Sequence, residues 1–244
     1  MLIYNIRQTS IFDRIFRRKP KIIALYAYRH DAHLVPDMLA NIQPFIDGWI
    51  AWDDTRRNTL WYHEGEVRQI LINAARQHSA DWVLCVDPDE RYEVGTKDKV
   101  ANLVKGEHDI IWGFKLREMY TVCQYRTDGL WGQKKSWRLF ALNESQDFMN
   151  VNVHSPWHLT NPEYKMQMSD INLYHLKMIA PENRKARVEI YNVVDTTGVQ
   201  AIGYDYLADE CGITLETIPS GRFYYPYSKI PPKIFQATPE KYIS

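Results

Sequence analysis

The stretch that decides the fold is residues 81–90, DWVLCVDPDE. Residues 82–86 are a run of five apolar side chains, which is typical of a short strand buried on both faces of a parallel sheet. The run stops at three carboxylates, Asp87, Asp89 and Glu90. In open α/β sheets, ligands bind beyond the carboxyl ends of the strands. The stretch therefore predicts a central strand and a binding site at its end.

The two aspartates have a spacing that suits a metal ion. Asp87 and Asp89 are two residues apart, so in extended backbone their side chains leave the chain on the same face. Pro88 fixes its own φ and disfavours the helical region for Asp87, which makes the local geometry stiff. Mg²⁺ and Mn²⁺ prefer one or two carboxylates together with phosphate oxygens, and the pair supplies the carboxylates. The alternative is a simple turn, because Asp and Pro are also common turn residues.

Composition narrows the class of protein. The chain has 244 residues, with 30 basic and 30 acidic side chains, and this balance argues against a nucleic-acid-binding protein. Its three cysteines are far apart, which favours a reduced, cytoplasmic protein over a disulfide framework. No apolar run approaches the roughly 20 residues that span a bilayer, and no signal-peptide core is present. We expect a cytoplasmic protein whose oligomeric state the sequence does not indicate.

Three regions are expected along the chain. Residues 1–20 form an N-terminal appendage, in which residues 11–16 place four apolar side chains on one helical face before a basic end. Such a helix either docks on the protein body or makes peripheral contact with the inner face of a membrane. Residues 21–180 form the main domain. Residues 181–244 form a C-terminal helix and a tail that wraps the surface.

Strands and helices alternate before the central strand. Strands are predicted at residues 21–28 and 48–52, and helices with one apolar face at residues 36–43 and 66–78. This order predicts right-handed crossovers and a parallel sheet. Each of the three strands ends in polar residues, so these ends are expected along one edge of the sheet.

The pattern changes after Glu93. Longer strands are predicted at residues 109–120 and 136–142, and shorter ones at 151–154 and 171–175, each of the shorter ones ending in a histidine. A basic helix is predicted from Pro181 to about Val194, with proline suited to its first turn. The fold class is therefore α/β: a mostly parallel central sheet with helices on both faces, a smaller strand region and a C-terminal helix.

At this point the chain, from about residue 21 to 175, resembles the family 2-type glycosyltransferases, which have the nucleotide-sugar (GT-A) fold. The strongest part is RQILINAARQHSADWVLCVDPDE, residues 68–90, which is similar to the family's helix, strand and D-x-D-E ending. WRLFAL, residues 137–142, resembles a downstream R-L-F strand. DDTRRNT, residues 53–59, is similar to the loop D-D-G-S-T-D-x-T, but it is one residue shorter and lacks the glycine.

The resemblance implies transfer of a sugar from a nucleoside diphosphate, most often a uridine one, to an acceptor hydroxyl, in glycan or polysaccharide synthesis. It implies Mn²⁺ or Mg²⁺ held by Asp87 and Asp89, with His175 as a further metal ligand. Asp87 would also contact the diphosphate. Arg68 could reach the diphosphate or support Asp53, or it could be an ordinary solvated helix residue. Tyr28, Arg29 and Asp53 would hold the nucleoside. His154 and His158 are weaker candidates.

A general base is harder to place. Inverting transfer needs a carboxylate on the acceptor side to deprotonate the hydroxyl. Some relatives carry a glutamate after the histidine that His154 resembles, but here Ser155 takes that place. The remaining candidates are Asp128 and Glu118, and either could be an ordinary surface acid. Trp131, Trp137 and Trp157 could form an acceptor platform or belong to the core.

Two other classes of protein stay open. A sugar-phosphate nucleotidylyltransferase uses the same kind of site, but it normally has a glycine-rich loop after the first strand, and residues 29–32 contain no glycine. A non-catalytic carbohydrate- or nucleotide-binding protein could keep the fold after losing its base. Metal-dependent nucleotide binding without turnover would favour the second.

Overall fold

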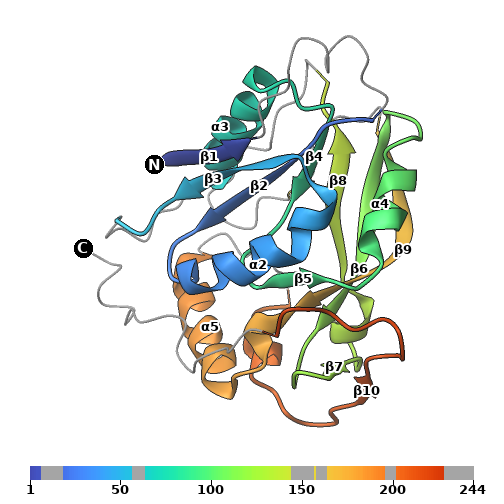
Figure 1. Cartoon of the computed structure of the whole chain (residues 1–244). Helices are drawn as coiled ribbons and strands as arrows, with labels where there is room; N and C mark the ends of the chain where they lie inside the picture. The colour runs from blue at the N-terminus through green and yellow to red at the C-terminus, as the bar shows by residue number, and fades with distance from the viewer. Residues whose placement is uncertain (7–18, 57–63, 144–156, 158–163, 196–201, 228–244) are drawn as a thin grey trace.

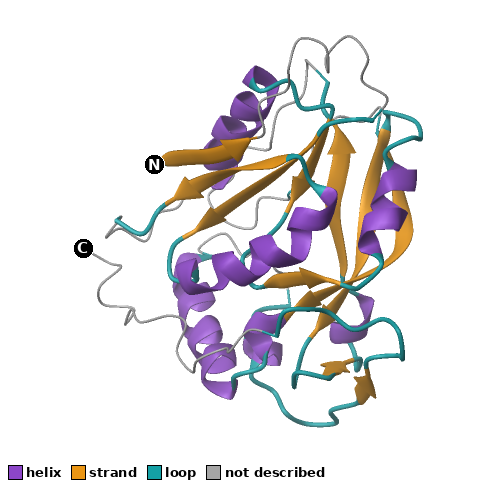
Figure 2. Cartoon of the chain, in the orientation of Figure 1, coloured by secondary structure: helices purple, strands orange, loops and turns teal. Residues whose placement is uncertain are grey.

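The computed structural model describes residues 1–6, 19–56, 64–143, 157, 164–195 and 202–227. Within these residues the chain forms an eight-stranded sheet, a separate two-stranded sheet and helices that flank the larger sheet (Figures 1 and 2). The strands are β1 (Leu2–Ile6), β2 (Ile22–Tyr28), β3 (Gly48–Asp53), β4 (Trp82–Cys85), β5 (Glu90–Tyr92), β6 (Ile110–Glu118), β7 (Gln124–Arg126), β8 (Lys135–Ala141), β9 (Lys165–His175) and β10 (Leu215–Thr217). The α-helices are α2 (Val35–Ile42), α3 (Glu64–Gln77), α4 (Thr96–Leu103) and α5 (Pro181–Val194).

The large sheet has a parallel half and a mixed half. Its strand order is β1-β3-β2-β4-β8-β6-β9-β5. Strands β3, β2 and β4 are parallel, with Tyr28 opposite Asp53 and Leu25 opposite Cys85. Of the remaining pairs, only β6 and β9 are parallel. The parallel half confirms the strand-helix-strand prediction and places the carboxyl ends of the three strands along one edge.

Helices cover both faces of the sheet, as the sequence pattern predicts. On one face, Met38 and Ile42 of α2 and Val100 of α4 pack with the inward side chains of β2, β4 and β8. On the other face, Val67 and Leu71 of α3 belong to a core that includes the opposite side chains of the same strands. Apolar residues three and four apart on α3 therefore meet alternate residues on the strands.

The central strand is completely enclosed. All four residues of β4 are fully buried, with β2 pairing on one side and β8 on the other. Five consecutive apolar residues are stable here because each face of the strand meets a helix layer. The chain leaves this strand at Val86 and reaches Asp87 at the edge of the sheet. The central strand predicted from residues 82–86 is confirmed.

The sequence pattern does not predict four of the elements outside the parallel half. Strand β5, helix α4, strand β7 and strand β10 are short, and none repeats an apolar period long enough to be recognised. Strand β9 begins at Lys165, six residues before the strand predicted at 171–175, and its first residues are exposed. The strand predicted at 151–154 lies outside the described residues.

The ends of the chain pack on the main sheet where they are described. Leu2–Ile6 pairs antiparallel with β3 and forms the edge of the large sheet. The amphipathic pattern at residues 11–16 lies outside the described residues. Helix α5 has the predicted bounds, Pro181–Val194. In the tail, β10 pairs with β7, and Tyr224 packs against Tyr174 with ring centroids 5.1 Å apart. No helix in the described ranges is long and apolar enough to cross a bilayer.

Candidate active site

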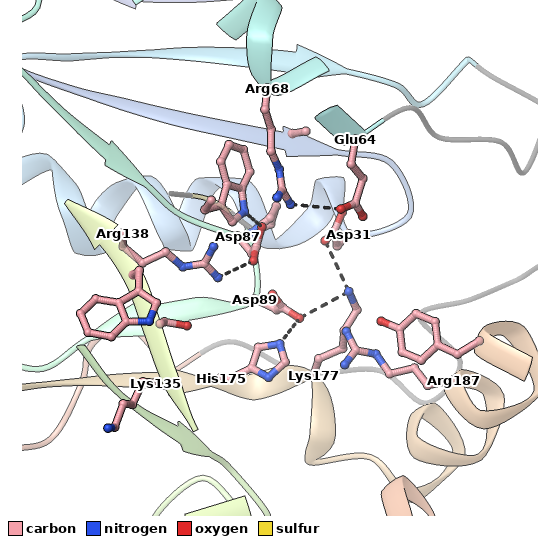
Figure 3. A pocket seen from close by; sticks show the side chains of 16 residues that line it. Asp31, Glu64, Arg68, Asp87, Asp89, Lys135, Arg138, His175, Lys177 and Arg187 are labelled. Carbon is pink, nitrogen blue, oxygen red and sulfur yellow. Dashed lines mark hydrogen bonds and ion pairs between the residues drawn. The ribbon is translucent and has the colours of Figure 1, made fainter. Parts of the chain in front are cut away.

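A polar cavity of about 530 Å³ opens at the carboxyl end of β4 (Figure 3). Its walls come from the loop after β4, from β8, from the end of β9 and from helices α3 and α5. The lining residues are Ala27, Asp31, Glu64, Arg68, Asp87, Pro88, Asp89, Lys135, Ser136, Trp137, Arg138, Trp157, His175, Lys177, Arg187 and Tyr191. The structure therefore brings together four predicted site residues: Arg68, Asp87, Asp89 and His175.

Asp87 is held through both carboxylate oxygens. Arg138 Nη2 donates to Oδ2 at 2.7 Å, and the indole Nε1 of Trp157 donates to Oδ1 at 3.0 Å. Burial alone would raise the pKa of Asp87, but Arg138 and Arg68 outweigh burial and lower it. The side chain is still 38% exposed. Asp87 is therefore a fixed, ionised carboxylate on the cavity wall.

Asp89 is deeper and lies between two cations. His175 Nε2 is 3.0 Å and Lys177 Nζ is 3.4 Å from Asp89 Oδ2. Burial would raise the pKa of Asp89, but Lys177 and His175 hold it well below its usual value. Despite these neighbours, Asp89 Oδ2 accepts no well-directed hydrogen bond from the residues that the structure describes. This oxygen keeps acceptor capacity.

His175 bridges two carboxylates. Its Nδ1 is 2.5 Å from Glu118 Oε2, and its Nε2 faces Asp89. Burial would lower the pKa of His175, but Glu118 and Asp89 raise it to about 10. The ring is thus an imidazolium at neutral pH. Its Nε2 lies beside the carboxylate expected to hold the metal, and the role of His175 as a further ligand stays a prediction.

The carboxylate pair fits a divalent cation that takes part of its shell from a ligand. Within the described ranges, no three His, Cys, Asp or Glu side chains form a group that could hold a metal ion by themselves. Mg²⁺, however, is commonly held by one or two carboxylates plus substrate phosphates and water. Asp87 is partly exposed, and Asp89 Oδ2 lacks a hydrogen bond. The donor set therefore suits a metal bound together with a phosphorylated ligand.

Glu90 holds the backbone of Asp87 and the side chain of Arg138. Its carboxylate accepts the backbone N–H of Asp87 at 2.9 Å and contacts Arg138 through its other oxygen. Burial raises the pKa of Glu90 to about 7, against the opposing effect of Arg138. Arg138 thus joins Glu90 and Asp87. The sequence contains Arg138 in the R-L-F strand, but only the pairing of β4 with β8 shows that it reaches Asp87.

The residues predicted to hold a nucleoside lie together beside the cavity. Tyr28 and Asp53 are opposite each other at the ends of β2 and β3, and a hydrogen bond between them contributes to the raised pKa of Tyr28, after burial and the charge of Asp53. Arg29 donates through Nε to Asp54 Oδ2 at 2.8 Å. A second, smaller cavity of about 120 Å³ is lined by Met1, Asp53, Asp54 and Arg56.

Arg68 is a buried residue on α3, not a solvated one. Its guanidinium lies 4.2 Å from the ring centre of Trp157, and Nη2 donates to Glu64 Oε2 at 3.2 Å. Arg68 is therefore fixed in the wall beside Asp87. Trp157 and Trp137 line the cavity, whereas Trp131 packs in a separate cluster with Met178 and Tyr204.

Neither predicted base lines the cavity. Glu118 lies behind His175, and Lys134 Nζ donates to it at 2.8 Å. Although burial would raise the pKa of Glu118, His175 and Lys134 lower it strongly, which makes it a weak base. Asp128 accepts from Arg126 at 2.8–3.0 Å and from the backbone N–H of Thr214 at 3.0 Å. His154 and His158 lie outside the described residues.

The chain has the predicted α/β, GT-A-like fold, and a charged cavity lies at the carboxyl edge of its parallel strands. No protein-family model matches the chain, and no curated protein matches it in sequence.

Among solved structures, the chain is similar to TarS of S. aureus. The crystal structure of TarS gives a TM-score of 0.44 at 10% identity, over 77% of this chain and 42% of that one. TarS 1–349 in complex with UDP gives a TM-score of 0.42 at 12% identity, over 77% of this chain and 69% of that one. The chain thus spans less than half the length of the first of these structures. No family assignment follows from these likenesses.

Proposed function

We propose that this chain is a glycosyltransferase that moves a sugar from a nucleoside diphosphate to an acceptor hydroxyl. The observation that carries the proposal is the position of Asp87 and Asp89. Both follow a central parallel strand and line a cavity of about 530 Å³ in which side chains from α3, β8 and β9 converge on them. Ligands of open α/β sheets bind at this edge.

Asp87 and Asp89 are the residues that would hold Mn²⁺ or Mg²⁺. When bound, such a cation stabilises the negative charge that develops on the diphosphate as the sugar–phosphate bond breaks. Around the pair, Arg138, Trp157 and Glu90 fix the carboxylate and backbone of Asp87 by direct hydrogen bonds. Because these contacts fix Asp87, it needs little rearrangement to bind a cation.

Tyr28, Arg29 and Asp53 are our candidates for the nucleoside site. Tyr28 offers a ring on which a base can stack, and Asp53 offers a carboxylate that can accept a base N–H. Arg29 is engaged with Asp54, which is buried, so its part is to fix the end of β2. Uridine is the first base to test, because it is the commonest one among the glycosyltransferases that the sequence resembles.

A binding protein without turnover is the second candidate. The observation that favours it is that Asp128 and Glu118 both lie away from the cavity wall, each engaged by a basic side chain. Inverting transfer needs a general base within reach of the acceptor hydroxyl. If another carboxylate of the cavity fills that role, turnover will be seen. If none does, the protein will bind nucleotide and leave it intact.

The test is nucleotide release from a panel of nucleoside-diphosphate sugars, with Mn²⁺, with Mg²⁺ and with EDTA. We expect one donor to release its nucleoside diphosphate in the presence of metal and an acceptor mixture. Asp89→Asn should lose this activity, whereas Asp98→Asn, an exposed aspartate on α4, should keep it. Metal-dependent nucleotide binding with no release from any donor would support the binding protein instead.

A further inference from the structure

The cavity has more positive than negative side chains. Five lining residues are Lys or Arg, namely Arg68, Lys135, Arg138, Lys177 and Arg187, and four are acidic, Asp31, Glu64, Asp87 and Asp89. His175 also lines the cavity, between two carboxylates. An excess of positive charge in a recessed site favours an anionic ligand. The question is which of these cations would meet it.

The basic side chains come from different elements of the cavity wall. Arg138 pairs with Asp87 and Glu90, and Arg68 pairs with Glu64 and stacks on Trp157. His175 is fixed between Asp89 and Glu118, and Lys135 is exposed at the rim. Lys177 and Arg187 line the wall formed by the segment after β9 and by α5.

Lys177 is held among carboxylates at distances that suit attraction more than close hydrogen bonds. Its ammonium lies 3.4 Å from Asp89 Oδ2 and 3.9 Å from Asp31 Oδ2, and the side chain is only 13% exposed. Lys177 is therefore an ammonium beside the aspartate pair, where it attracts the oxygens of an anionic ligand.

Arg187 is presented to the cavity by a firmly anchored helix. Arg184, one turn earlier on α5, donates to Met178 O at 2.6 Å and to Glu210 Oε1 at 2.6 Å, and it stacks on Tyr120. These contacts fix the start of α5 against the segment after β9. Residues 184, 187 and 191 share one helical face. Arg187 and Tyr191 therefore line the cavity while Arg184 holds the helix in place.

We propose that Lys177 and Arg187 bind phosphate oxygens of the donor's diphosphate, on the side of the cavity facing Asp87 and Asp89 (Figure 3). Two like charges on one wall are stabilised together when an anion binds between them. They would stabilise the diphosphate as it leaves the sugar. This inference rests on the proposed function for the identity of the ligand, but the anion-binding wall can be tested without it.

The first probe is inorganic pyrophosphate, which needs no assumption about the nucleoside. We expect Lys177→Met and Arg187→Met each to weaken pyrophosphate binding roughly 10- to 100-fold by calorimetry, because charge-assisted hydrogen bonds are lost. Lys177→Arg should retain most of the affinity. Lys185→Met, an exposed lysine on the same helix, is the matched control and should bind like the wild type. Arg187→Met keeps the test open if Lys177→Met folds poorly.

The second arm compares uridine, UMP and UDP and separates the possible sources of phosphate. We expect both variants to weaken UDP far more than uridine, and UDP to displace pyrophosphate from the wild type. UDP that binds without displacing pyrophosphate would overturn the assignment in favour of a phosphate on the acceptor. Equal losses of affinity for uridine and UDP would show that Lys177 and Arg187 have only a structural role. Failure of the wild type to bind pyrophosphate would also contradict the proposed anion-binding site. If pyrophosphate binding depends on Lys177 but no nucleotide binds, the anion-binding site is supported and the proposed function is contradicted.

Discussion

At the scale of single residues, Asp87 is oriented by contacts that come from distant parts of the chain. Arg138 and Trp157 are 51 and 70 residues away from it in sequence, yet each donates to one of its carboxylate oxygens. Such contacts fix the direction of the remaining lone pairs. A ligand therefore meets a carboxylate whose geometry is already set.

Trp157→Phe tests whether the contact from Trp157 orients the carboxylate of Asp87. The substitution removes the N–H that donates to Asp87 Oδ1 at 3.0 Å but keeps an aromatic ring near the guanidinium of Arg68. We expect metal-dependent nucleotide affinity to fall about 10- to 150-fold, which corresponds to the net contribution of about 1.5–3 kcal/mol from a hydrogen bond to a charged group. Calorimetric titration at fixed Mn²⁺ measures it. Unchanged affinity would mean that Arg138 alone orients Asp87.

Asp128→Asn tests whether Asp128 is the general base. Asp128 is bonded to Arg126 and to the backbone of Thr214 and does not line the cavity. We expect the variant to keep both nucleotide affinity and turnover, measured as nucleotide release. A loss of about 10²-fold or more in turnover with affinity retained would instead identify Asp128 as the base.

The site was only partly predictable at this scale. An apolar run that ends in acids is a local signal, so Asp87 and Asp89 could be predicted from residues 81–90 alone. Lys177 and Arg187 have no such signal, because only the pairing of β9 with β5 and the anchoring of α5 bring them to Asp89. The sequence makes Asp128 a candidate base because it is acidic, but it gives no signal for the hydrogen bond from Arg126, two residues earlier.

At the scale of elements, Glu93 joins four segments of the mixed half. Its carboxylate accepts from Lys99 of α4 at 2.7 Å, from Asn172 of β9 at 2.9 Å and from Arg222 of the tail at 2.7 and 2.9 Å. Glu93 itself follows β5 and is 3% exposed. One buried carboxylate thus links β5, α4, β9 and the tail by hydrogen bonds.

Glu93→Gln should lower the free energy of unfolding by about 1.5–3 kcal/mol, because the charge-assisted hydrogen bonds from Lys99 and Arg222 to a buried carboxylate are weakened. Urea denaturation measures the change. Glu107→Gln is the matched control: its ion pair with Lys165 is exposed on both sides, so a loss of at most about 1 kcal/mol is expected. Equal effects of the two substitutions would contradict the structural role of Glu93.

The same network sets a dependence of stability on pH. Burial would raise the pKa of Glu93, but its bonds to Arg222 and Lys99 lower it below the ordinary value of 4.5. A carboxylate with a lowered folded-state pKa stabilises the fold fully above its unfolded pKa, and the stabilisation is lost as pH falls. We therefore expect the stability difference between wild type and Glu93→Gln to be constant above pH 5 and to shrink below about pH 4.5. Urea denaturation at a series of pH values measures it, and a difference that persists undiminished at pH 3 would contradict this account.

Gly113 on β6 allows Trp137 of β8 to reach the cavity wall. A Cβ at this position would lie 2.6 Å from the Trp137 ring and 2.6 Å from Met168 Sδ. We expect Gly113→Ala to destabilise the fold by about 1–3 kcal/mol through overpacking. The control is Gly106→Ala, whose Cβ would meet only Leu103 O at 3.2 Å. Equal unfolding free energies for the two variants would contradict the prediction.

At the scale of the whole molecule, the sequence predicts the parallel half better than the mixed half. Strands β2, β3 and β4 and helices α2 and α3 have full apolar faces, so their periods are visible and their order implies a parallel sheet. Strand β5 consists of Glu90, Arg91 and Tyr92, and all three are buried. Glu90 forms an ion pair with Arg138, and Arg91 donates to backbone carbonyls. Buried polar strands cannot be recognised from hydrophobic periodicity. Strands β7 and β10 have only three residues each, so they show no apolar period either.

The most direct test of the central claim is a thermal-shift panel of nucleoside diphosphates and their sugars, with Mn²⁺, with Mg²⁺ and with EDTA. A ligand at a hundredfold excess over its Kd stabilises the folded state by about 2.7 kcal/mol, which for a chain of this size raises the Tm by several degrees. The account predicts such a rise for one nucleotide, in the presence of metal, and its absence in Asp89→Asn. No rise with any nucleotide, or an equal rise in Asp89→Asn and wild type, would contradict it.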